Sequence, residues 1–474
     1  MGETGPETMR LIMGNIRDWL RRHNIEEIEC LVPGINGNSL GKLVHLDRLI
    51  KEDIRLPEAV LLQSITGGYP EDFEEILGET DCDMFLAADP NAACVVPWAE
   101  VPTAQIIHDC HTRDGHMHPL SCRGVLKRVI NLFEIEGWRP VVAPEIEFYL
   151  ISQCFHSQAK IQPATGRSGR SEKVRKSYTI EAIKEFDSLV REVFVNCESM
   201  GIDVDSIVDE SGAAQMEMNF LHGDALNLAD QVFSLKRLLH ETAMKHGIFA
   251  TFMAKPIDRQ PGSSMHIHQS IVRIDDGKNI FIDKHGNENK SFRYYVGGLQ
   301  KYTNAMMAFY APNPNSYRRL RKGTAAPINV DWGYDNRTVG IRVPDSSADS
   351  KRVENRFSGV DSNPYLAIAA TLASGYLGMK MAIEPTTPIQ GSSYDQAIVL
   401  PRTLEKALQF LDESQEVHEV FGSDFVEAFL AVKGYEYKEF NSSMGLMRRF
   451  YSGIFAQSNR LVSSWEREHL LLNI

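Results

Sequence analysis

Residues 141–150 read VVAPEIEFYL and alternate as a β-strand with two different faces does. Successive side chains on a strand point to opposite faces, so Glu145 and Glu147 share one face while Ile146 and Phe148 lie on the other. Two neighbouring carboxylates repel each other unless a cation lies between them. The pattern predicts either a metal-binding strand or a solvated strand face, which is common for Glu-x-Glu.

Two later runs have the same arrangement. Residues 215–220, QMEMNF, place Glu217 between polar neighbours on one face, and the preceding turn could bring Glu210 back beside it. An exposed edge strand would explain this run as well. Residues 265–270, MHIHQS, place both histidines on one face after a Gly/Ser turn, where small residues allow a ligand to approach the backbone closely. A paired histidine face is harder to explain as structure alone.

A fourth run, residues 352–357, reads RVENRF and aligns two arginines with the glutamate between them, as a surface ion-pair ladder also would. The four runs together supply carboxylates and an imidazole suited to two or three hard divalent cations, Mg²⁺ or Mn²⁺. This candidate metal set consists of Glu145, Glu147, Glu210, Glu217, His266 and Glu354.

Arginines are frequent in the same part of the chain, and their planar guanidinium groups bind phosphate and carboxylate in a bidentate manner. They are Arg318, Arg319, Arg337, Arg342, Arg352 and Arg356. Metal ligands next to arginines favour phosphoryl transfer from a nucleotide, in which the protein positions groups and neutralises charge. The sequence has neither a P-loop motif nor a kinase glycine-rich loop.

The composition of the 474 residues is that of a globular protein, with 43% hydrophobic and 24% charged residues. This excludes whole-length disorder, collagen and a coiled-coil rod. A formal net charge of −13 argues against diffuse binding to nucleic acid or to an anionic membrane. Seven cysteines without a C-x-x-C pair, no long apolar run and no apolar N-terminal segment predict a cytoplasmic protein with reduced thiols and no membrane span.

Periodicity predicts helices over residues 8–22, 179–200, 224–246 and 364–383, the last one buried because it is almost entirely apolar. Residues 89–119 have weak periodicity and are expected to connect a smaller N-terminal part to a larger C-terminal part. Residues 156–176 carry six basic residues and no apolar period. They are interpreted as a solvated loop or as a loop that binds an anion or a partner.

These motifs resemble the glutamine synthetase superfamily in its bacterial class I-like branch. The resemblance rests on MHIH at 265–268, NSYRR at 315–319 and NRTVGIRVP at 336–344, and it is weaker near residues 36–42. It implies an α+β fold: a β-grasp N-terminal domain over residues 10–115, then a catalytic domain over residues 116–474 with a curved antiparallel sheet flanked by helices. It also implies a homo-oligomer of stacked rings, with a dodecamer of two hexamers expected, and active sites between subunits.

The resemblance further implies that ATP phosphorylates the γ-carboxylate of L-glutamate and that an amine then displaces phosphate. By the same resemblance, Glu147, Glu210 and Glu217 would bind the metal beside glutamate, and Glu145, His266 and Glu354 the metal at the ATP phosphates. Gly262, Arg319 and Arg356 would bind glutamate, and Arg337 would stabilise the transferring phosphoryl group. Nucleotide contacts would come from Phe220, His268, Ser270, Arg342 and Arg352.

The sequence departs from glutamine synthetases where those enzymes bind ammonium. Ala325 stands where the family has a glutamate, residues 63–67 contain no acid where the family has an aspartate, and Pro261 replaces an asparagine. Without these counter-charges ammonium should be a poor substrate, and the small side chains of Ala325 and Ser64 leave room for an organic amine. The sequence therefore looks more like the γ-glutamylpolyamine and γ-glutamylputrescine synthetases and their relatives that act on monoamines.

Two alternatives to an amine ligase remain open at this point. An acid from another loop, such as Glu71, Asp72 or Glu74, could replace the missing glutamate. The protein would then be a glutamine synthetase that uses ammonia. A catalytically silent ring protein is the third hypothesis, although such proteins tend to lose metal carboxylates.

Overall fold

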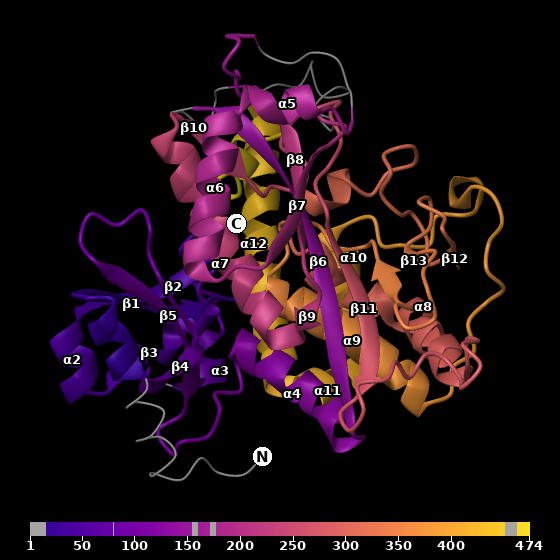
Figure 1. The fold of residues 1–474 in the computed structure, drawn as a ribbon, viewed down its shortest axis with the longest axis horizontal. Coiled ribbons are helices and arrows are strands. Elements are labelled where there is room, and N and C mark those ends of the chain that lie inside the picture. Colours follow the sequence, from indigo (N-terminus) through magenta and orange to yellow (C-terminus); the bar gives the residue numbers. More distant parts are fainter. Residues whose placement is uncertain (1–15, 79, 154–159, 171–176, 451–461) are drawn as a thin grey trace.

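The computed structural model describes residues 16–78, 80–153, 160–170, 177–450 and 462–474. The smaller N-terminal part is built on a five-stranded sheet in the order β2-β1-β5-β4-β3, at the lower left of Figure 1. Its strands are β1 (Glu27–Pro33), β2 (Ser39–His45), β3 (Ile54–Pro57), β4 (Asp83–Val95) and β5 (Thr103–His111). The short helices α2 (Leu46–Lys51) and α3 (Phe73–Leu77) accompany it. Only the β1–β5 pair is parallel, and whether this is a β-grasp domain stays a prediction.

The prediction that residues 89–119 form a connection between the two parts of the chain is wrong. Most of this segment forms the end of β4 and all of β5, and β5 lies in the middle of the N-terminal sheet. Its polar residues obscured the strand pattern because they have buried partners. Gln105, for example, donates from Nε2 to Ser234 Oγ at 2.8 Å. A central strand buried on both faces does not need the simple alternation of a half-exposed strand.

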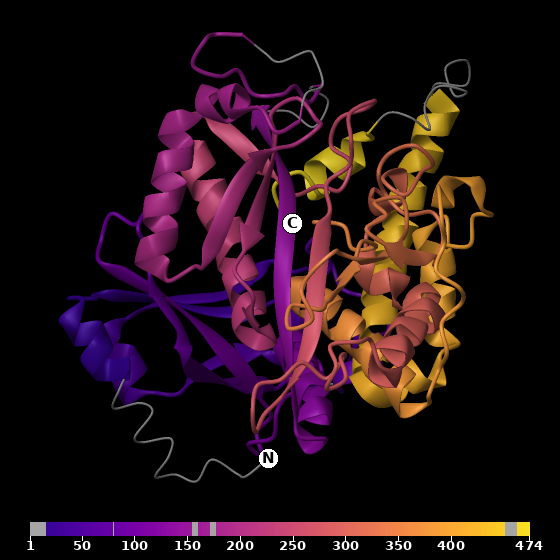
Figure 2. The same cartoon turned by 45° about the vertical axis from the view of Figure 1, so that its right-hand side comes forward.

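A nine-stranded sheet forms the larger part, in the order β12-β13-β14-β11-β6-β8-β7, with β9 and β10 also pairing with β6. Its long central strands are β6 (Trp138–Ser152) and β11 (Met265–Arg273), which run upright through the middle of Figures 1 and 2. The others are β7 (Val204–Asp209), β8 (Gln215–Phe220), β9 (Gly223–Asp224), β10 (Ile248–Thr251), β12 (Trp332–Tyr334), β13 (Ile341–Val343) and β14 (Val353–Asn355). All four predicted strands are confirmed, and β8 is an inner strand, not an edge.

Helices surround this sheet, which confirms a mixed α and β fold. They are α4 (Cys122–Ile135), α5 (Ile180–Glu185), α6 (Asp187–Met200), α7 (Ala225–Lys245), α8 (Lys290–Tyr310), α9 (Pro364–Lys380), α10 (Leu404–Asp412), α11 (Gln415–Phe421), α12 (Ser423–Phe450) and α14 (Ser464–His469). Among the helices of the described part, none is both long and apolar enough to cross a membrane.

Two predicted helices are confirmed nearly to the residue. The Asp224 side chain accepts hydrogen bonds from the amides of Leu226 and Asn227 and so caps α7. Asn363 caps α9, which begins with Pro364 and is almost wholly buried. The helix predicted over residues 179–200 is broken into α5 and α6 at Phe186, where ψ is 27°, and it ends at Gly201 as expected. Of the helix predicted over 8–22, residues 16–22 are helical and the rest lies outside the described residues.

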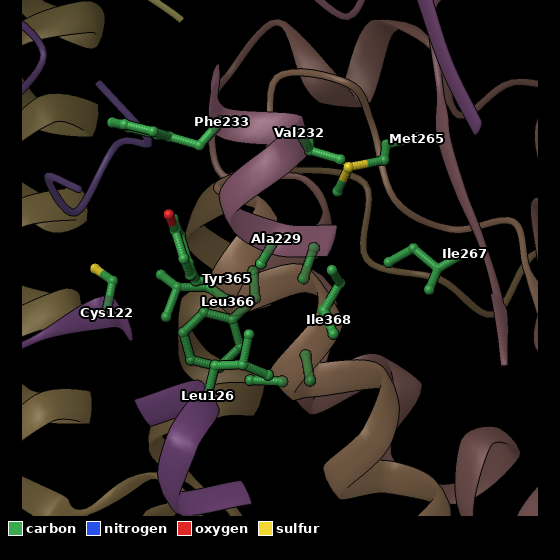
Figure 3. Close-up of a cluster of buried hydrophobic side chains, with 14 of the residues drawn as sticks. Cys122, Leu126, Ala229, Val232, Phe233, Met265, Ile267, Tyr365, Leu366 and Ile368 are labelled. Carbon is green, nitrogen blue, oxygen red and sulfur yellow. The ribbon is translucent and has the colours of Figure 1, made fainter. Parts of the chain in front are cut away.

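The core lies where α7 and α9 pack against the inner face of β11. Figure 3 shows Val232 of α7 beside Met265 of β11, with Leu366 and Ile368 of α9 below them. These side chains are at most 1% exposed. Packing on this face holds the long strands in place and leaves their opposite, polar face for the candidate site. Of the basic segment 156–176, residues 160–170 are described, and the rest lies outside the described residues.

Candidate active site

Strand pairing brings together polar residues that are far apart in the sequence. In the β6–β8 ladder Glu147 lies opposite Glu217, and in the β6–β11 ladder Glu145 lies opposite His266. Opposite residues on neighbouring strands have Cβ atoms about 4.5–5.5 Å apart, so the functional groups meet on one face. The metal-binding interpretation of the Glu-x-Glu strand is therefore favoured over a solvated face, since Glu147 is only 7% exposed.

Glu145 is held between the two histidines of β11. Its Oε1 lies 2.9 Å from His268 Nε2, and its Oε2 lies 3.4 Å from His266 Nδ1. Although burial disfavours a charged carboxylate here, these hydrogen bonds hold the pKa of Glu145 far below its usual range. Burial lowers the pKa of His266 to about 4, so this imidazole is neutral and can serve as a metal ligand.

Glu354 of β14 completes this side of the site. It is 1% exposed, Arg342 donates to its Oε2 at 2.7 Å, and Arg356 donates to its Oε1. Burial opposes the charge of Glu354, but the positive charge of Arg356 outweighs it, and the pKa falls to about 2. His266 Nδ1 lies 3.9 Å from Glu354 Oε1. Because its pKa is about 2, Glu354 is anionic at neutral pH.

Glu147, Glu210 and Glu217 behave in the opposite way. Burial, followed by the charge of Glu210, raises the pKa of Glu147 to about 8. Burial, followed by the charges of Glu147 and Glu145, raises the pKa of Glu217 to about 9. The pKa of Glu210 is also raised by burial. Ser264 donates to Glu147 from its amide at 2.9 Å and from its hydroxyl at 3.1 Å, which fixes the carboxylate in place.

The donor set fits divalent cations. Two groups have potential ligand atoms within 4.8 Å of one another: Glu145 with Glu217 and His266, and Glu145 with His268 and Glu354. Carboxylates that keep protons near pH 8 repel one another when they are charged. A bound cation would remove this repulsion. The grouping overlaps the expected one but adds His268, which sequence reasoning assigned to the nucleotide. Glu147 and Glu210 lie beside these groups and line a cavity.

A cavity of about 940 Å³ lies along β6, β8 and β11, beside Glu145. Four of the five residues expected to contact the nucleotide line it: Phe220, His268, Ser270 and Arg352. Arg352 Nε donates to His268 Nδ1 at 3.3 Å, which links the cavity to the metal candidates. The fifth, Arg342, lies apart from this lining and is engaged with Glu354 and with Asp335 at 2.6 Å. The site expected for the nucleotide is thus largely assembled, with Arg342 as the exception.

A second cavity of about 330 Å³ joins the residues expected to bind glutamate to the metal candidates. It is lined by Glu147, Glu210, Ser211, Lys255, Arg259, Gln260, Pro261, Gly262, Ser264, His266, Arg319, Gly323, Thr324, Ala325, Ala326 and Arg356. A Cβ at Gly262 would lie 2.4 Å from Arg319 Cγ and 2.8 Å from the Ala254 carbonyl oxygen, so only glycine fits there. We call this space the acceptor cavity.

Buried guanidinium groups line the acceptor cavity. Arg319 is 2% exposed, and burial lowers its pKa to about 10. Within the described residues, Nε of Arg319 and Nε of Arg356 have no hydrogen-bond partner. A buried donor without a partner costs about 1–3 kcal/mol, and a bound carboxylate would satisfy it. Both residues therefore suit an anionic substrate.

Arg337 is exposed and lies in a separate cavity of about 790 Å³ with Asp335 and Thr338. Its charge is nonetheless close enough to lower the pKa of Glu210 against the effect of burial. The structure thus places Arg337 at the edge of the carboxylate cluster, not inside the acceptor cavity.

Sequence reasoning missed several residues of the site. Tyr178 has φ 60°, is 63% exposed and lies close enough to Glu210 and Arg337 to feel their charges, with its pKa raised mainly by burial. It follows a basic segment without periodicity, so no pattern marked it. Lys255 and Arg259 were missed because they lie in an irregular loop. Their position seven and three residues before Gly262, where the Gly/Ser run begins, was the available signal.

The acids proposed as substitutes for the missing glutamate lie elsewhere in this chain. Among the described residues, the acids that line the acceptor cavity are Glu147 and Glu210, and none of Glu71, Asp72 and Glu74 is among them. Ala325 lines the cavity with φ 60°, a backbone conformation that is uncommon for a residue with a side chain. Within one chain, the acceptor cavity thus has the small, uncharged Ala325 in its lining, as expected.

The chain is similar to known proteins along most of its length. The family model of the glutamine synthetase catalytic domain matches residues 119–449. A glutamate–isopropylamine ligase of a Pseudomonas species is 33% identical over 90% of this chain and 95% of its own. The γ-glutamylputrescine synthetase PuuA of Escherichia coli K12 is 30% identical over 90% of this chain and 91% of its own. A glutamine synthetase of Pyrococcus horikoshii is 31% identical over 94% of this chain and 95% of its own.

Solved structures show the same fold. GmaS without ligand superposes with a TM-score of 0.77 at 24% sequence identity, covering 90% of this chain and 96% of that one. A GmaS complex with ADP gives the same TM-score and identity, covering 96% of this chain and 98% of that one.

Proposed function

The chain belongs to the glutamine synthetase family, and from this premise we propose that it is an ATP-dependent ligase that joins the γ-carboxylate of L-glutamate to an organic amine. The observation that carries the proposal is the lining of the acceptor cavity. Arginines suited to glutamate and carboxylates suited to metal are present, while an uncharged Ala325 occupies the place of the family's glutamate. The relatives named after isopropylamine and putrescine add support, since each acts on an organic amine.

Glutamate is held by groups of fixed geometry. We assign its carboxylates to the guanidinium groups of Arg319 and Arg356, whose Nε atoms otherwise lack partners among the described residues. Gly262 lets the substrate approach the backbone, because any side chain there would collide with Arg319. Burial of the arginines strengthens their attraction for an anion relative to the same groups in water. The γ-carboxylate would then lie toward Glu147 and Glu210, with a bound cation between these anionic groups.

ATP would occupy the cavity beside β11, contacted by Phe220, His268, Ser270 and Arg352, with Arg342 of β13 assigned to the phosphates. Glu145, Glu147, Glu210, Glu217, His266 and Glu354 would hold two or three Mg²⁺ or Mn²⁺ ions, which neutralise phosphate oxygens when bound. Arg337 lies at the edge of the cluster, where it can stabilise the charge on the transferring group. In this step an oxygen of the γ-carboxylate would attack the γ-phosphorus of ATP, the P–O bond to ADP would break and ADP would leave, which gives γ-glutamyl phosphate.

The amine completes the reaction by attack on the γ-carbonyl carbon. Its nitrogen lone pair forms the C–N bond, the C–O bond to phosphate breaks, and phosphate leaves with that electron pair. The nitrogen loses a proton and an amide results. Ammonium and an alkylammonium ion must both lose a proton before attack, but ammonium has no carbon chain and depends on counter-charges to be held, and this chain places no acid at Ala325 for that purpose. An organic amine can instead be held by packing of its carbon chain.

Glutamine synthetase activity is the second candidate, because glutamine synthetases of about 31% identity cover as much of the chain as the amine ligases do. Phosphate release measured with ATP, Mg²⁺, glutamate and a panel of amines, with ammonium included, separates the two. We expect organic amines to support turnover and ammonium to be inferior by about 100-fold in kcat/KM. Equal use of ammonium and the best amine would favour a glutamine synthetase. No phosphate release with any amine or with ammonium would rule out both activities.

Introducing the missing carboxylate is a sharper test of the same site. Ala325→Glu should improve the use of ammonium relative to the best organic amine, because it restores a counter-charge beside the acceptor nitrogen. Ala325→Gln, which has the same size without the charge, is the matched control and should lower organic amine use without improving ammonium use. A variant pair with identical ammonium kinetics would contradict the role given to this position.

We also propose domain boundaries at residues 10–115 and 116–474, a cytoplasmic location and a dodecamer of two hexameric rings with active sites shared between subunits. Light scattering on the purified protein measures the assembly: about twelve chain masses of 53.4 kDa support the dodecamer, and a monomer contradicts it.

A further inference from the structure

The C-terminal segment, residues 462–474, packs on its own chain beside the motif that carries Arg319. Trp465 of this segment belongs to a buried apolar cluster that also contains Tyr149 of β6. The helix α14 of the segment carries a fully buried acid, Glu466. Within the described chain, no residue of this segment lines the acceptor cavity. Any effect of Glu466 on the substrate must therefore pass through other residues.

Glu466 forms a bidentate ion pair with the motif NSYRR at 315–319. Arg318 donates from Nε to Oε1 of Glu466 at 2.6 Å and from Nη2 to Oε2 at 2.9 Å. The amide of Ser463 donates to Oε2 at 2.6 Å, which fixes the orientation of the carboxylate. Paired guanidinium and carboxylate groups of this kind are strong and geometrically specific. Because Arg319 directly follows Arg318, the ion pair constrains the backbone that carries the arginine assigned to glutamate.

Asn315 of the same motif links Glu466 to a second segment. Its Nδ2 donates to Glu466 Oε1 at 2.9 Å. The same side chain pairs with the backbone of Lys255, since Oδ1 accepts from the Lys255 amide at 2.7 Å and Nδ2 donates to the Lys255 carbonyl oxygen at 3.2 Å. Glu466 is thus connected through one amide side chain to the start of the loop that contains Gly262.

The motif and this loop meet at the place assigned to glutamate. The loop closes where the amide of Ser263 donates to the carbonyl oxygen of Ala254 at 2.8 Å. A Cβ at Gly262 would lie 2.4 Å from Arg319 Cγ, so the two segments are in close contact there. A displacement of either segment by about 1 Å would misplace the groups that hold the substrate, which can cost about 100-fold in rate.

We infer that Glu466 is a positioning residue for glutamate: it sets the position of Arg319 relative to the loop of Gly262 from outside the acceptor cavity. The inference rests on the proposed function and adds a residue to the same site. The contacts that carry it join Glu466, Arg318 and Asn315, whose side chains are at most 13% exposed. The arrangement is therefore a property of the single chain.

The motif has a second anchor that does not involve Glu466. Asp361 Oδ2 accepts hydrogen bonds from Asn313 Nδ2 at 3.0 Å and from the hydroxyl of Ser316. Glu466→Gln keeps the size of the side chain, but its amide nitrogen cannot accept a hydrogen bond as the replaced oxygen does. Because the second anchor remains, this change should displace the motif and not unfold it.

Steady-state kinetics of the complete protein with ATP, Mg²⁺ and the best organic amine test the inference. In Glu466→Gln, the KM for glutamate should rise by about tenfold or more, while the KM for ATP should stay within about twofold. Arg318→Lys keeps the positive charge but removes the bidentate geometry, so it should give the same pattern. It decides the question if Glu466→Gln fails to fold. Glu466→Asp retains a carboxylate and should lie between Glu466→Gln and the original protein.

Asp230→Asn is the matched control for loss of a buried charge. Asp230 also accepts a bidentate ion pair, from Nε of Arg123 at 3.0 Å and from Nη2 at 2.8 Å, and it accepts from the hydroxyl of Tyr365 at 2.7 Å. It belongs to the contact between α4 and α7, and it is not among the lining residues of the acceptor cavity. The control should lower the Tm and leave the KM for glutamate within about twofold of the original value.

The outcomes separate the inference from the function on which it rests. If Glu466→Gln and Arg318→Lys behave like the control, with a lower Tm and an unchanged KM for glutamate, the ligase stands and the inference is wrong. Equal increases in the KM values for glutamate and ATP would show a general loss of structure and would also overturn it. If no amine supports turnover by the original protein, the proposed function fails and the inference falls with it.

Discussion

At the scale of single residues, the environment of each carboxylate decides its charge. Glu145 and Glu354 lie beside histidines or arginines and are held anionic, whereas burial, and after it the charges of neighbouring carboxylates, raises the pKa of Glu147 and of Glu217 so that both keep protons. All of these residues are glutamates on neighbouring strands of one sheet. Their difference comes from which groups the strand register places opposite them.

Replacing Glu217 by glutamine should abolish most activity. The substitution keeps the size of the side chain but removes a charge at a point where the candidate metal ligands Glu145 and His266 converge. We expect kcat/KM to fall by at least about 100-fold, because even outer-shell changes at metal sites cost 10–100-fold. Coupled measurement of ADP formation checks this. Glu198→Gln, an exposed residue of α6, is the control, and similar activity of both variants would contradict the assignment.

The metal-free protein should lose stability as the pH rises. The pKa values of Glu147 and Glu217 are raised to about 8 and about 9 in the folded state, from 4.5 in the unfolded chain. The folded state thus retains protons that the unfolded state has released, so the stabilisation is complete below pH 4.5 and is lost as pH rises through 8 to 9.

Thermal melts in a chelator between pH 6 and 9 measure this loss. The Tm should fall with rising pH, and the fall should be smaller in Glu217→Gln, which has no proton to lose. Excess Mg²⁺ should raise the Tm of the original protein most at high pH, because cation binding favours the folded state. A Tm that is independent of pH and Mg²⁺ would contradict the assignment of Glu147 and Glu217 to a metal site.

At the scale of elements, one buried guanidinium joins the N-terminal sheet to the helices of the larger part. Arg123 of α4 is 1% exposed and donates to Asp89 of β4 at 2.6 Å, to Asp109 of β5 at 2.6 Å and to Asp230 of α7 at 2.8 Å. Tyr365 of α9 donates to Asp230 at 2.7 Å. The cluster fixes how the strand β5, which sequence reasoning took for a connection, docks on the helices.

Arg123→Ala should destabilise the protein by about 3–5 kcal/mol, because it leaves the buried Asp230 without its charge partner. Urea unfolding followed by circular dichroism measures the change. Arg21→Ala removes an exposed ion pair with Asp18, whose side chains are 67% and 72% exposed, and should cost less than about 1 kcal/mol. Equal effects of the two variants would show that the cluster contributes no more than a surface pair.

At the scale of the whole molecule, the two parts share one core. A single cluster of contacting buried side chains runs from Ile16 and Leu20 in the N-terminal part to Phe429 and Val432 in α12. Figure 2 shows the N-terminal sheet reaching in beside the long strands of the larger sheet. The active-site face and the N-terminal part are therefore mechanically connected within one chain.

We expect both parts to unfold together. Differential scanning calorimetry of the complete protein should give one transition, because separating the parts would expose a continuous core and the charges around Arg123. Limited proteolysis provides the second readout and should release no stable fragment ending near residue 115. Two resolved transitions, or a protease-resistant fragment of residues 116–474, would contradict shared stability.

The sequence by itself determined the strands β6, β8 and β11, the capped helices α7 and α9, and the pairing of polar residues on one face. These features follow from alternation, capping and periodicity, which are local properties of the chain. Motif resemblance then predicted most of the site residues, and the structure gathers four of the six candidate metal ligands in two groups and four of the five nucleotide residues in one cavity. Whether each performs its predicted role stays a prediction.

Only the tertiary structure decided that β5 is a central strand, that the helix after residue 179 breaks at Phe186, and that Lys255 and Arg259 line the acceptor cavity. It also decided which glutamates are charged. Each of these depends on groups brought together from distant parts of the chain, such as Arg123 with Asp89 or Glu147 with Glu217. Burial and the electric field of neighbours are set by packing, and no local pattern encodes them.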